Sequence, residues 1–263
     1  MAGGSHRLWE LTRAGRIFSG SGLSVDQRTM LRATIVYLFV ALYVLLAVPI
    51  GLLWALLTKD TTCLYKLARV CILVAGWLCQ VKVKVRGTEN IAPGQTYVFL
   101  SNHQGNFDGP VLLYAIPRDF RALIKKEMLR IPILSLVLKY VNFVPIDRSH
   151  ANKALAGIDF GAKLLKQGYS FVAFPEGTRT RDGRLGEFKK GVFVMALKAG
   201  VPILPISIID SSKIQPPGSY SIRPGSVKLI FHDPIPTANL KIQDREHLIE
   251  RTRAAIASGL AQP

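Results

Sequence analysis

Two residues five positions apart, His103 and Asp108, form the pair in this sequence that is best suited to acid–base chemistry. They stand in residues 102–108, which read Asn-His-Gln-Gly-Asn-Phe-Asp. An imidazole has a pKa of about 6.5 in model peptides, so its neutral form accepts a proton from a hydroxyl group near neutral pH. A carboxylate on the other ring nitrogen fixes the tautomer and stabilises the imidazolium that forms. The pair therefore indicates a general base that activates a hydroxyl nucleophile.

This pair needs a turn to bring its two side chains together. Residues five positions apart lie about 140° apart around a helix and on opposite faces of a strand. The run 97–101 predicts a strand, the Gly-Asn pair at 105–106 permits a turn, and 108–110 (Asp-Gly-Pro) is typical of a helix start. The pair would then lie at the carboxyl end of a strand, where open α/β sheets bind ligands. Two simpler interpretations compete: Asp108 as a helix cap, and His103 as a surface loop residue.

A second segment, residues 174–179 (Phe-Pro-Glu-Gly-Thr-Arg), follows another predicted strand and combines groups that bind anions. Arg179 offers a planar guanidinium for phosphate, Thr178 a hydroxyl, and Gly177 a turn that exposes backbone N–H groups. Glu176 would repel a phosphate, so we expect it to orient an arginine or a glycerol hydroxyl. The simpler alternative is an ordinary turn with solvated charges.

Two further cations follow predicted strands. Lys125 directly follows the run 121–124, and Arg148 comes two residues after the run 143–146. Both would face the same edge of a parallel sheet as the two segments above, where phosphate groups would attract them. The alternative for each is a solvated surface charge.

The sequence offers little support for a covalent nucleophile or a metal site. It contains no Gly-x-Ser-x-Gly elbow, and its three cysteines, Cys63, Cys71 and Cys79, have no Cys-x-x-Cys spacing. We expect these thiols to be reduced and buried, and we expect no metal. The nucleophile is then a hydroxyl group of the substrate.

The pattern of apolar runs predicts the fold class. Seven apolar or alternating runs predict strands, and helical patterns lie between many of them: residues 81–85, 97–101, 121–124, 143–146, 171–174, 203–209 and 227–231. Strands that alternate with helices predict an α/β fold with a mostly parallel sheet flanked by helices. We place this domain at residues 81–263. The segment 215–224, which is rich in proline, is expected to be a surface loop.

The N-terminal part of the chain predicts a helical membrane anchor. The 26 residues Ala33–Thr58 carry no formal charge. A straight helix of that length reaches about 39 Å, which exceeds a hydrocarbon core of about 30 Å. A break at Pro49 would leave only about 24 Å before it.

Basic residues flank this anchor on both sides: Arg28, Arg32, Lys59, Lys66, Arg69, Lys82 and Lys84. Positive flanks favour the cytoplasmic side. We therefore expect residues 1–80 to form a basic segment and an anchor that enters and leaves on the cytoplasmic side, as a hairpin or within one leaflet. One kinked transmembrane helix is the alternative.

Four blocks, taken together and in this order, resemble the glycerolipid acyltransferase family, specifically its lysophosphatidic acid acyltransferases. The blocks are residues 102–108, 144–148, 174–179 and 201–206, and the resemblance covers residues 81–231. Each block alone is a weak signal. The ordered set is specific, and it favours the catalytic interpretations over the structural alternatives given above. One departure is Gly105, where the family often has serine, which leaves any hydroxyl support of the turn in doubt.

The resemblance implies a membrane enzyme of phospholipid biosynthesis. Such an enzyme transfers a fatty acyl group from acyl-CoA or acyl carrier protein to the sn-2 hydroxyl of lysophosphatidic acid, which forms phosphatidic acid. The resemblance makes His103 the general base and Asp108 its orienting partner. It assigns the phosphate end of the acceptor to a second set of residues, with Lys125 assisting: Arg148, Glu176, Gly177, Thr178 and Arg179. It implies no metal or other cofactor.

Three alternatives remain open at this stage. In the first, the acceptor is glycerol-3-phosphate or another lysophospholipid. In the second, the chain is a non-catalytic binder of anionic lipid. The third is nucleic-acid binding through the formal net charge of +17. We expect no nucleic-acid partner, because the long uncharged run has no use in such a protein.

Overall fold

The computed structural model describes residues 24–146, 151–180 and 184–261. Its seven strands are β1 (Val81–Arg86), β2 (Val98–Ser101), β3 (Phe120–Lys125), β4 (Val144–Ile146), β5 (Ser170–Ala173), β6 (Ile203–Ile209) and β7 (Gly225–Phe231). The α-helices are α1 (Val25–Thr58), α2 (Thr62–Cys79), α3 (Asp108–Ala115), α4 (Pro132–Tyr140), α5 (Ala151–Lys166), α6 (Gly191–Ala199), α7 (Ser211–Ile214) and α8 (Arg245–Leu260). Short 3-10 turns are η1 (Thr88–Asn90), η2 (Lys126–Arg130) and η3 (Ile242–Asp244).

The strands form one sheet in the order β1-β7-β6-β2-β5-β3-β4. The five strands from β6 to β4 are parallel to one another, whereas β7 is antiparallel to β6 and parallel to β1. The predicted α/β class with a mostly parallel sheet is confirmed. All seven predicted runs become strands, and their ends differ from the prediction by at most two residues.

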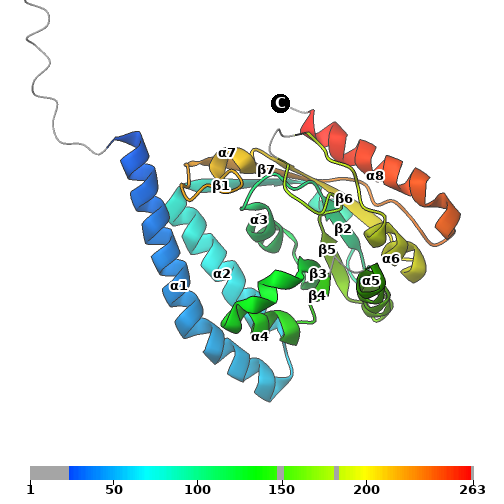
Figure 1. The fold of residues 1–263 in the computed structure, drawn as a ribbon, viewed down its shortest axis with the longest axis horizontal. Coiled ribbons are helices and arrows are strands. Elements are labelled where there is room, and N and C mark those ends of the chain that lie inside the picture. The colour runs from blue at the N-terminus through cyan, green and yellow to red at the C-terminus, as the bar shows by residue number, and fades with distance from the viewer. Residues whose placement is uncertain (1–23, 147–150, 181–183, 262–263) are drawn as a thin grey trace, which may run out of the picture.

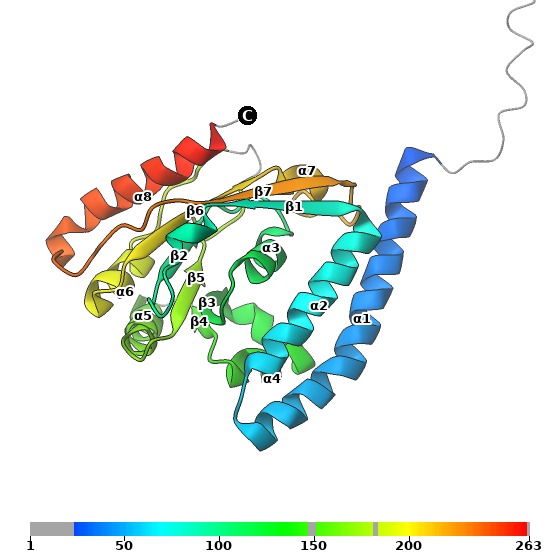
Figure 2. The same cartoon turned by 180° about the vertical axis from the view of Figure 1, so that it is seen from behind.

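Helices cover both faces of this sheet (Figures 1 and 2). One core cluster packs side chains of α5, α6 and α8 against the sheet, and a second packs α1, α2 and α3 against the opposite face. The central strands β2, β5 and β6 are buried on both faces, which explains their continuous apolar sequence. The edge strand β1 instead alternates between half-buried and exposed residues.

The N-terminal helix α1 continues through Pro49, so the break considered there does not occur. Its 34 residues correspond to about 51 Å of helix. A proline removes one intrahelical hydrogen bond and bends a helix, and α1 keeps its helical conformation on both sides of Pro49. Ser24 begins α1 with a capping box, and Lys59 ends it in the left-handed conformation. The chain then reverses into α2, so α1 and α2 form the expected hairpin (Figure 1).

Both ends of α1 contact the α/β body. Near its start, Ala33 and Val36 are buried in the core cluster that also contains strand residues. Near its end, Ala55 is buried beside Val141, and its carbonyl accepts a hydrogen bond of 2.6 Å from Tyr140. The hairpin therefore lies along the body and does not project from it.

Polar side chains of α2 form hydrogen bonds with β3 and with the end of α3. Arg69, which we expected to be a flanking membrane charge, donates to three carbonyls in and just after the last turn of α3: Leu113, Ile116 and Arg118. Tyr65 donates its hydroxyl to the carbonyl of Phe120 and accepts from Arg121 at 3.0 Å. Tyr65 and Arg121 are 4% and 5% exposed, so these groups depend on each other for their hydrogen bonds.

Replacing Tyr65 by phenylalanine should therefore destabilise the protein. The change leaves a buried carbonyl and a buried guanidinium without this partner, which costs about 1–3 kcal/mol. We expect a lower thermal unfolding midpoint in detergent. Tyr114→Phe is the control, because Tyr114 is 37% exposed. Equal midpoints for both variants would contradict a structural role of the Tyr65 hydroxyl.

Candidate active site

His103 and Asp108 come together in the turn between β2 and α3. The imidazole Nδ1 lies 2.7 Å from Asp108 Oδ2. Asp108 is the first residue of α3 and its side chain is fully buried, whereas the His103 side chain is 22% exposed. The predicted turn thus produces the predicted pair, with the carboxylate inside and the imidazole at the surface.

The Asp108 carboxylate fixes the tautomer of His103. Its Oδ2 atom also accepts hydrogen bonds from the backbone N–H groups of Gln104, at 2.7 Å, and Gly105, at 2.9 Å. An ionised carboxylate only accepts hydrogen bonds, so His103 Nδ1 must carry the hydrogen. The lone pair then lies on Nε2. That nitrogen is the one available to accept a proton from a hydroxyl group.

The second predicted segment and Thr180, the residue that follows it, hold the backbone of His103 on both sides. The N–H of His103 donates to Glu176 Oε1 at 2.9 Å, and its carbonyl accepts from the Thr180 N–H at 2.9 Å. The imidazole stacks on the Phe174 ring, with centroids 3.9 Å apart and planes inclined by 13°. The two segments therefore form one site. Sequence analysis assigned no role to Phe174 or Thr180.

Glu176 has a different environment from the one that we expected. Its second oxygen, Oε2, accepts from the Gly186 N–H at 2.7 Å, and the residue is 4% exposed. Both oxygens thus bind backbone N–H groups instead of an arginine or a glycerol hydroxyl. Burial raises the pKa of Glu176, while these hydrogen bonds and the nearby His103 and Arg253 act in the opposite direction. Direct contact of Glu176 with a substrate stays a prediction.

The predicted cations follow adjacent parallel strands of the sheet. The order β2-β5-β3-β4 places the ends of these four strands side by side. Thr178 and Arg179 are exposed beyond β5, and Lys125 is exposed at the end of β3. Arg179 donates to the Asn106 side-chain oxygen in the His103 turn. Arg148 lies just beyond β4 and outside the described residues.

Asn102 is a site residue to which sequence analysis gave no role. It is fully buried, and its amide makes two hydrogen bonds of 2.7 Å with the backbone of Ile208 in β6. These bonds fix the end of β2 directly before His103. The available signal in the sequence was an asparagine placed between a predicted strand and a candidate base.

Close packing explains why residue 105 is glycine. A Cβ atom at this position would lie 2.9 Å from the backbone carbonyl of Ser211 and 3.2 Å from the carbonyl oxygen of Gln215. The same Gln215 oxygen accepts from the Asn106 N–H at 3.3 Å. Gln215 is 6% exposed and Ile222 is 2% exposed, so the predicted surface loop 215–224 contributes to the core. Ser211 and Gln215 thus pack against residues 103–108, the candidate catalytic turn.

Comparison with known proteins gives consistent results. The family model described as Acyltransferase matches residues 82–209. A 1-acyl-sn-glycerol-3-phosphate acyltransferase of Borreliella burgdorferi is 31% identical over 192 residues, which cover 73% of this chain and 77% of that protein. A chloroplastic 1-acyl-sn-glycerol-3-phosphate acyltransferase of Arabidopsis thaliana is 38% identical over 156 residues, or 59% of this chain. The match spans only 44% of the length of that plant protein.

A solved structure has the same fold. The crystal structure of the 1-acyl-sn-glycerophosphate acyltransferase PlsC from Thermotoga maritima superimposes with a TM-score of 0.77 and 27% sequence identity. The alignment covers 89% of this chain and 96% of that one. The likeness therefore extends over the helical hairpin as well as the sheet.

The tight turn predicts opposite effects at two neighbouring glycines. Gly105→Ala should destabilise the protein by about 1–3 kcal/mol, because a methyl group would press against the backbone of Ser211. Gly109→Ala is the matched control: nothing lies within 4 Å of a Cβ there, and alanine favours the α3 helix by up to about 1 kcal/mol. Chemical unfolding in detergent measures both. Equal stability of the two variants would contradict the packing described here.

Proposed function

The chain belongs to the glycerolipid acyltransferase family, and we propose that it transfers a fatty acyl group from an acyl thioester to the sn-2 hydroxyl of lysophosphatidic acid, forming phosphatidic acid. The observation that carries this proposal is the His103–Asp108 pair, which is fixed against a segment with exposed anion-binding groups. The names of the relatives support the acceptor.

In the proposed reaction, Nε2 of His103 removes the proton of the acceptor hydroxyl as its oxygen attacks the thioester carbonyl. Asp108 stabilises the imidazolium, because its carboxylate lies 2.7 Å from Nδ1. Collapse of the tetrahedral intermediate expels the thiolate, which takes up the proton from the imidazolium. The acyl group passes directly between the two substrates, without a covalent enzyme intermediate.

The acceptor phosphate would bind at the edge of the sheet beyond β5. Arg179 and Thr178 are exposed there, and a guanidinium binds phosphate oxygens in pairs. Arg179 also donates to Asn106, only three residues from the base. A phosphate at this arginine would therefore bring the acceptor hydroxyl close to His103. We place Lys125, Arg148 and Gly177 in the same site, where the Gly177 N–H donates to the Phe174 carbonyl at 3.0 Å and closes the turn that presents Thr178 and Arg179.

The donor is acyl-CoA or acyl carrier protein, and the reaction requires no metal or other cofactor. Transfer of an acyl group from a thioester to an alcohol involves no redox step, and the base is an amino-acid side chain. The phosphate groups of either carrier are negatively charged, and the formal net charge of +17 indicates a basic protein surface that attracts them.

We propose that the helical hairpin holds this domain on the cytoplasmic face of a membrane. Helices α1 and α2 are both long and apolar enough to cross a bilayer. Much of α1 is exposed and apolar, including Leu38, Ile50 and Leu57. However, both ends of α1 contact the α/β body, so a crossing of about 30 Å would draw the body into hydrocarbon. This contact supports an anchor that lies in one leaflet.

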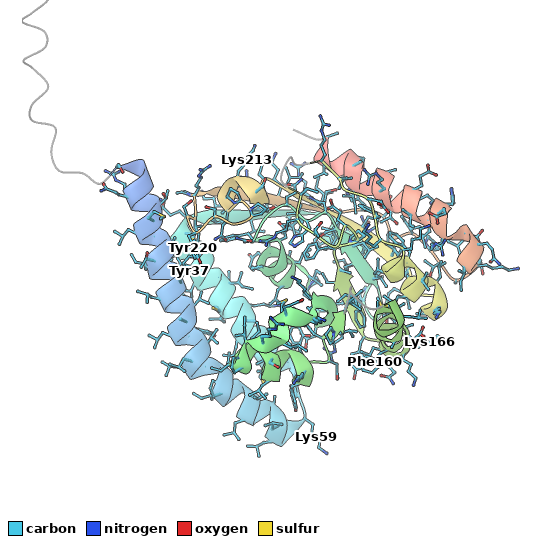
Figure 3. All side chains as sticks on the ribbon, in the orientation of Figure 1. Tyr37, Lys59, Phe160, Lys166, Lys213 and Tyr220 are labelled. Carbon is cyan, nitrogen blue, oxygen red and sulfur yellow. The ribbon has the colours of Figure 1, made fainter. Side chains whose placement is uncertain are left out.

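The anchor is also close to the catalytic turn. Tyr37 of α1 accepts a hydrogen bond from the Gln215 side chain, and the Gln215 carbonyl binds the N–H of Asn106. Tyr37 lies beside Tyr220, with ring centroids 6.3 Å apart (Figure 3). In membrane proteins, tyrosine side chains are enriched at the level of the lipid headgroups. A lysophospholipid in the leaflet would thus meet His103 near the membrane surface.

Loss of the base should abolish turnover. His103→Ala and Asp108→Asn should each lower kcat by about 10²–10⁴-fold, because the proton acceptor or its orientation is lost. The assay uses purified protein in detergent with radiolabelled acyl-CoA and a panel of lysophosphatidic acid, glycerol-3-phosphate and lysophosphatidylcholine.

His247→Ala is the matched control for this experiment, because His247 is exposed on α8. Binding of His103→Ala to anionic vesicles should persist. Unchanged transfer by His103→Ala would contradict the proposed base. Equal turnover of another acceptor in the panel would contradict the proposed substrate.

An anchor within one leaflet predicts that the tip of the hairpin stays on the cytoplasmic side. Lys59 lies at that tip, whereas Lys213 lies on α7 of the α/β body (Figure 3). Lys59→Cys and Lys213→Cys are made in a background with Cys63, Cys71 and Cys79 replaced by alanine. An impermeant maleimide should label both in inside-out bacterial vesicles and neither in spheroplasts. Labelling of Lys59→Cys alone in spheroplasts would instead indicate a transmembrane α1.

A further inference from the structure

Arg253 of the C-terminal helix α8 binds the segment that follows the candidate phosphate site. Its Nη2 atom donates to the Leu185 carbonyl at 2.7 Å, and Nη1 donates to the Gly186 carbonyl. The guanidinium carbon lies 5.4 Å from the centroid of the Phe188 ring, which is 4% exposed. A planar guanidinium fork thus holds two successive carbonyls.

The peptide group between Leu185 and Gly186 is hydrogen-bonded at both of its ends. Its carbonyl accepts from Arg253, and its N–H donates to Glu176 Oε2 at 2.7 Å. The other oxygen of Glu176 accepts from the N–H of His103 at 2.9 Å. Hydrogen bonds in series polarise one another, so a cation at the carbonyl strengthens the N–H as a donor.

We infer that Arg253 is a positioning residue for His103, which it reaches through the Leu185–Gly186 peptide and the Glu176 carboxylate. This inference rests on the function proposed above for its kinetic test. Arg253 lies beyond residues 82–209, to which the family model is matched. The helix α8 crosses one side of the sheet beside α6 (Figure 1). An element distant in sequence therefore sets the orientation of the base.

Two features make this connection rigid. Leu248 and Ile256 of α8 are fully buried in the core cluster on that face of the sheet, so the helix that carries Arg253 is fixed. At the other end, a Cβ atom at Gly186 would lie 3.0 Å from Glu176 Oε2, so the backbone approaches the carboxylate closely. The positive charge of Arg253 also opposes the effect of burial on the pKa of Glu176, which favours the ionised acceptor.

The first test compares variants of Arg253 with a matched control on the same helix. Arg253→Ala should lower kcat for acyl transfer about tenfold or more, while KM for both substrates stays within about twofold, because the base is misplaced and the substrate groups are not. Arg253→Lys should lie in between, since one ammonium cannot bind two carbonyls as a fork. Arg251→Ala is the control, because Arg251 is exposed.

A double-mutant cycle tests the route through Glu176. Adding Arg253→Ala to Glu176→Gln should change kcat less than twofold, because the connection is already broken. Independent effects of the two residues on kcat would multiply the two losses. A purely structural role for Arg253 would instead lower the folded fraction and leave kcat per folded molecule unchanged. Either result would overturn the inference.

Hydrogen–deuterium exchange gives a readout that does not depend on activity. In Arg253→Ala, amide exchange in peptides that contain His103 should accelerate about tenfold, while peptides of β1 stay unchanged. Faster exchange together with an inactive wild type would reject the proposed function and keep the positioning role. Unchanged exchange and unchanged kcat in Arg253→Ala would reject the positioning role and keep the proposed function.

Discussion

The structure of the site depends on the backbone of His103, which is hydrogen-bonded on both sides by the segment after β5. Its N–H binds Glu176, and its carbonyl binds Thr180. A base on a free loop would sample many orientations, and ordering each residue costs about 1–2 kcal/mol of backbone entropy. Because β2 and β5 are neighbours in the sheet, that ordering is completed during folding. The imidazole is therefore oriented before a substrate arrives.

Two buried carboxylates support this arrangement, and each has backbone donors. Asp108 and Glu176 are 0% and 4% exposed, which would be very unfavourable for isolated charges. Asp108 accepts from the amides of the turn as well as from the imidazole, and Glu176 accepts from two amides that are far apart in sequence. The carboxylates thus connect separate loops into one rigid site. Thr178 and Arg179, the groups proposed to bind the acceptor, remain exposed.

The sequence predicted the parts of this protein that depend on local patterns. The buried central strands appear as apolar runs, and the residue types of the His103 turn point to a general base. Two features were missed because they depend on contacts between distant segments. Gln215 supports the catalytic turn, and the carboxylate of Glu176 binds backbone amides. Arg253 had no local signal, since its partners lie almost seventy positions earlier in the chain.

The proposed membrane anchor, the hairpin of α1 and α2, is part of the folded domain. Ala33, Val36 and Cys79 share one buried cluster with Phe99 and Leu204 of the central strands, so removal of the hairpin would expose the core. A detachable anchor joined by a linker would let the active site tumble above the bilayer. An anchor that packs on the sheet instead gives the site a fixed height and tilt. This rigidity suits the proposed reaction, in which one substrate lies in the leaflet and the other arrives from water.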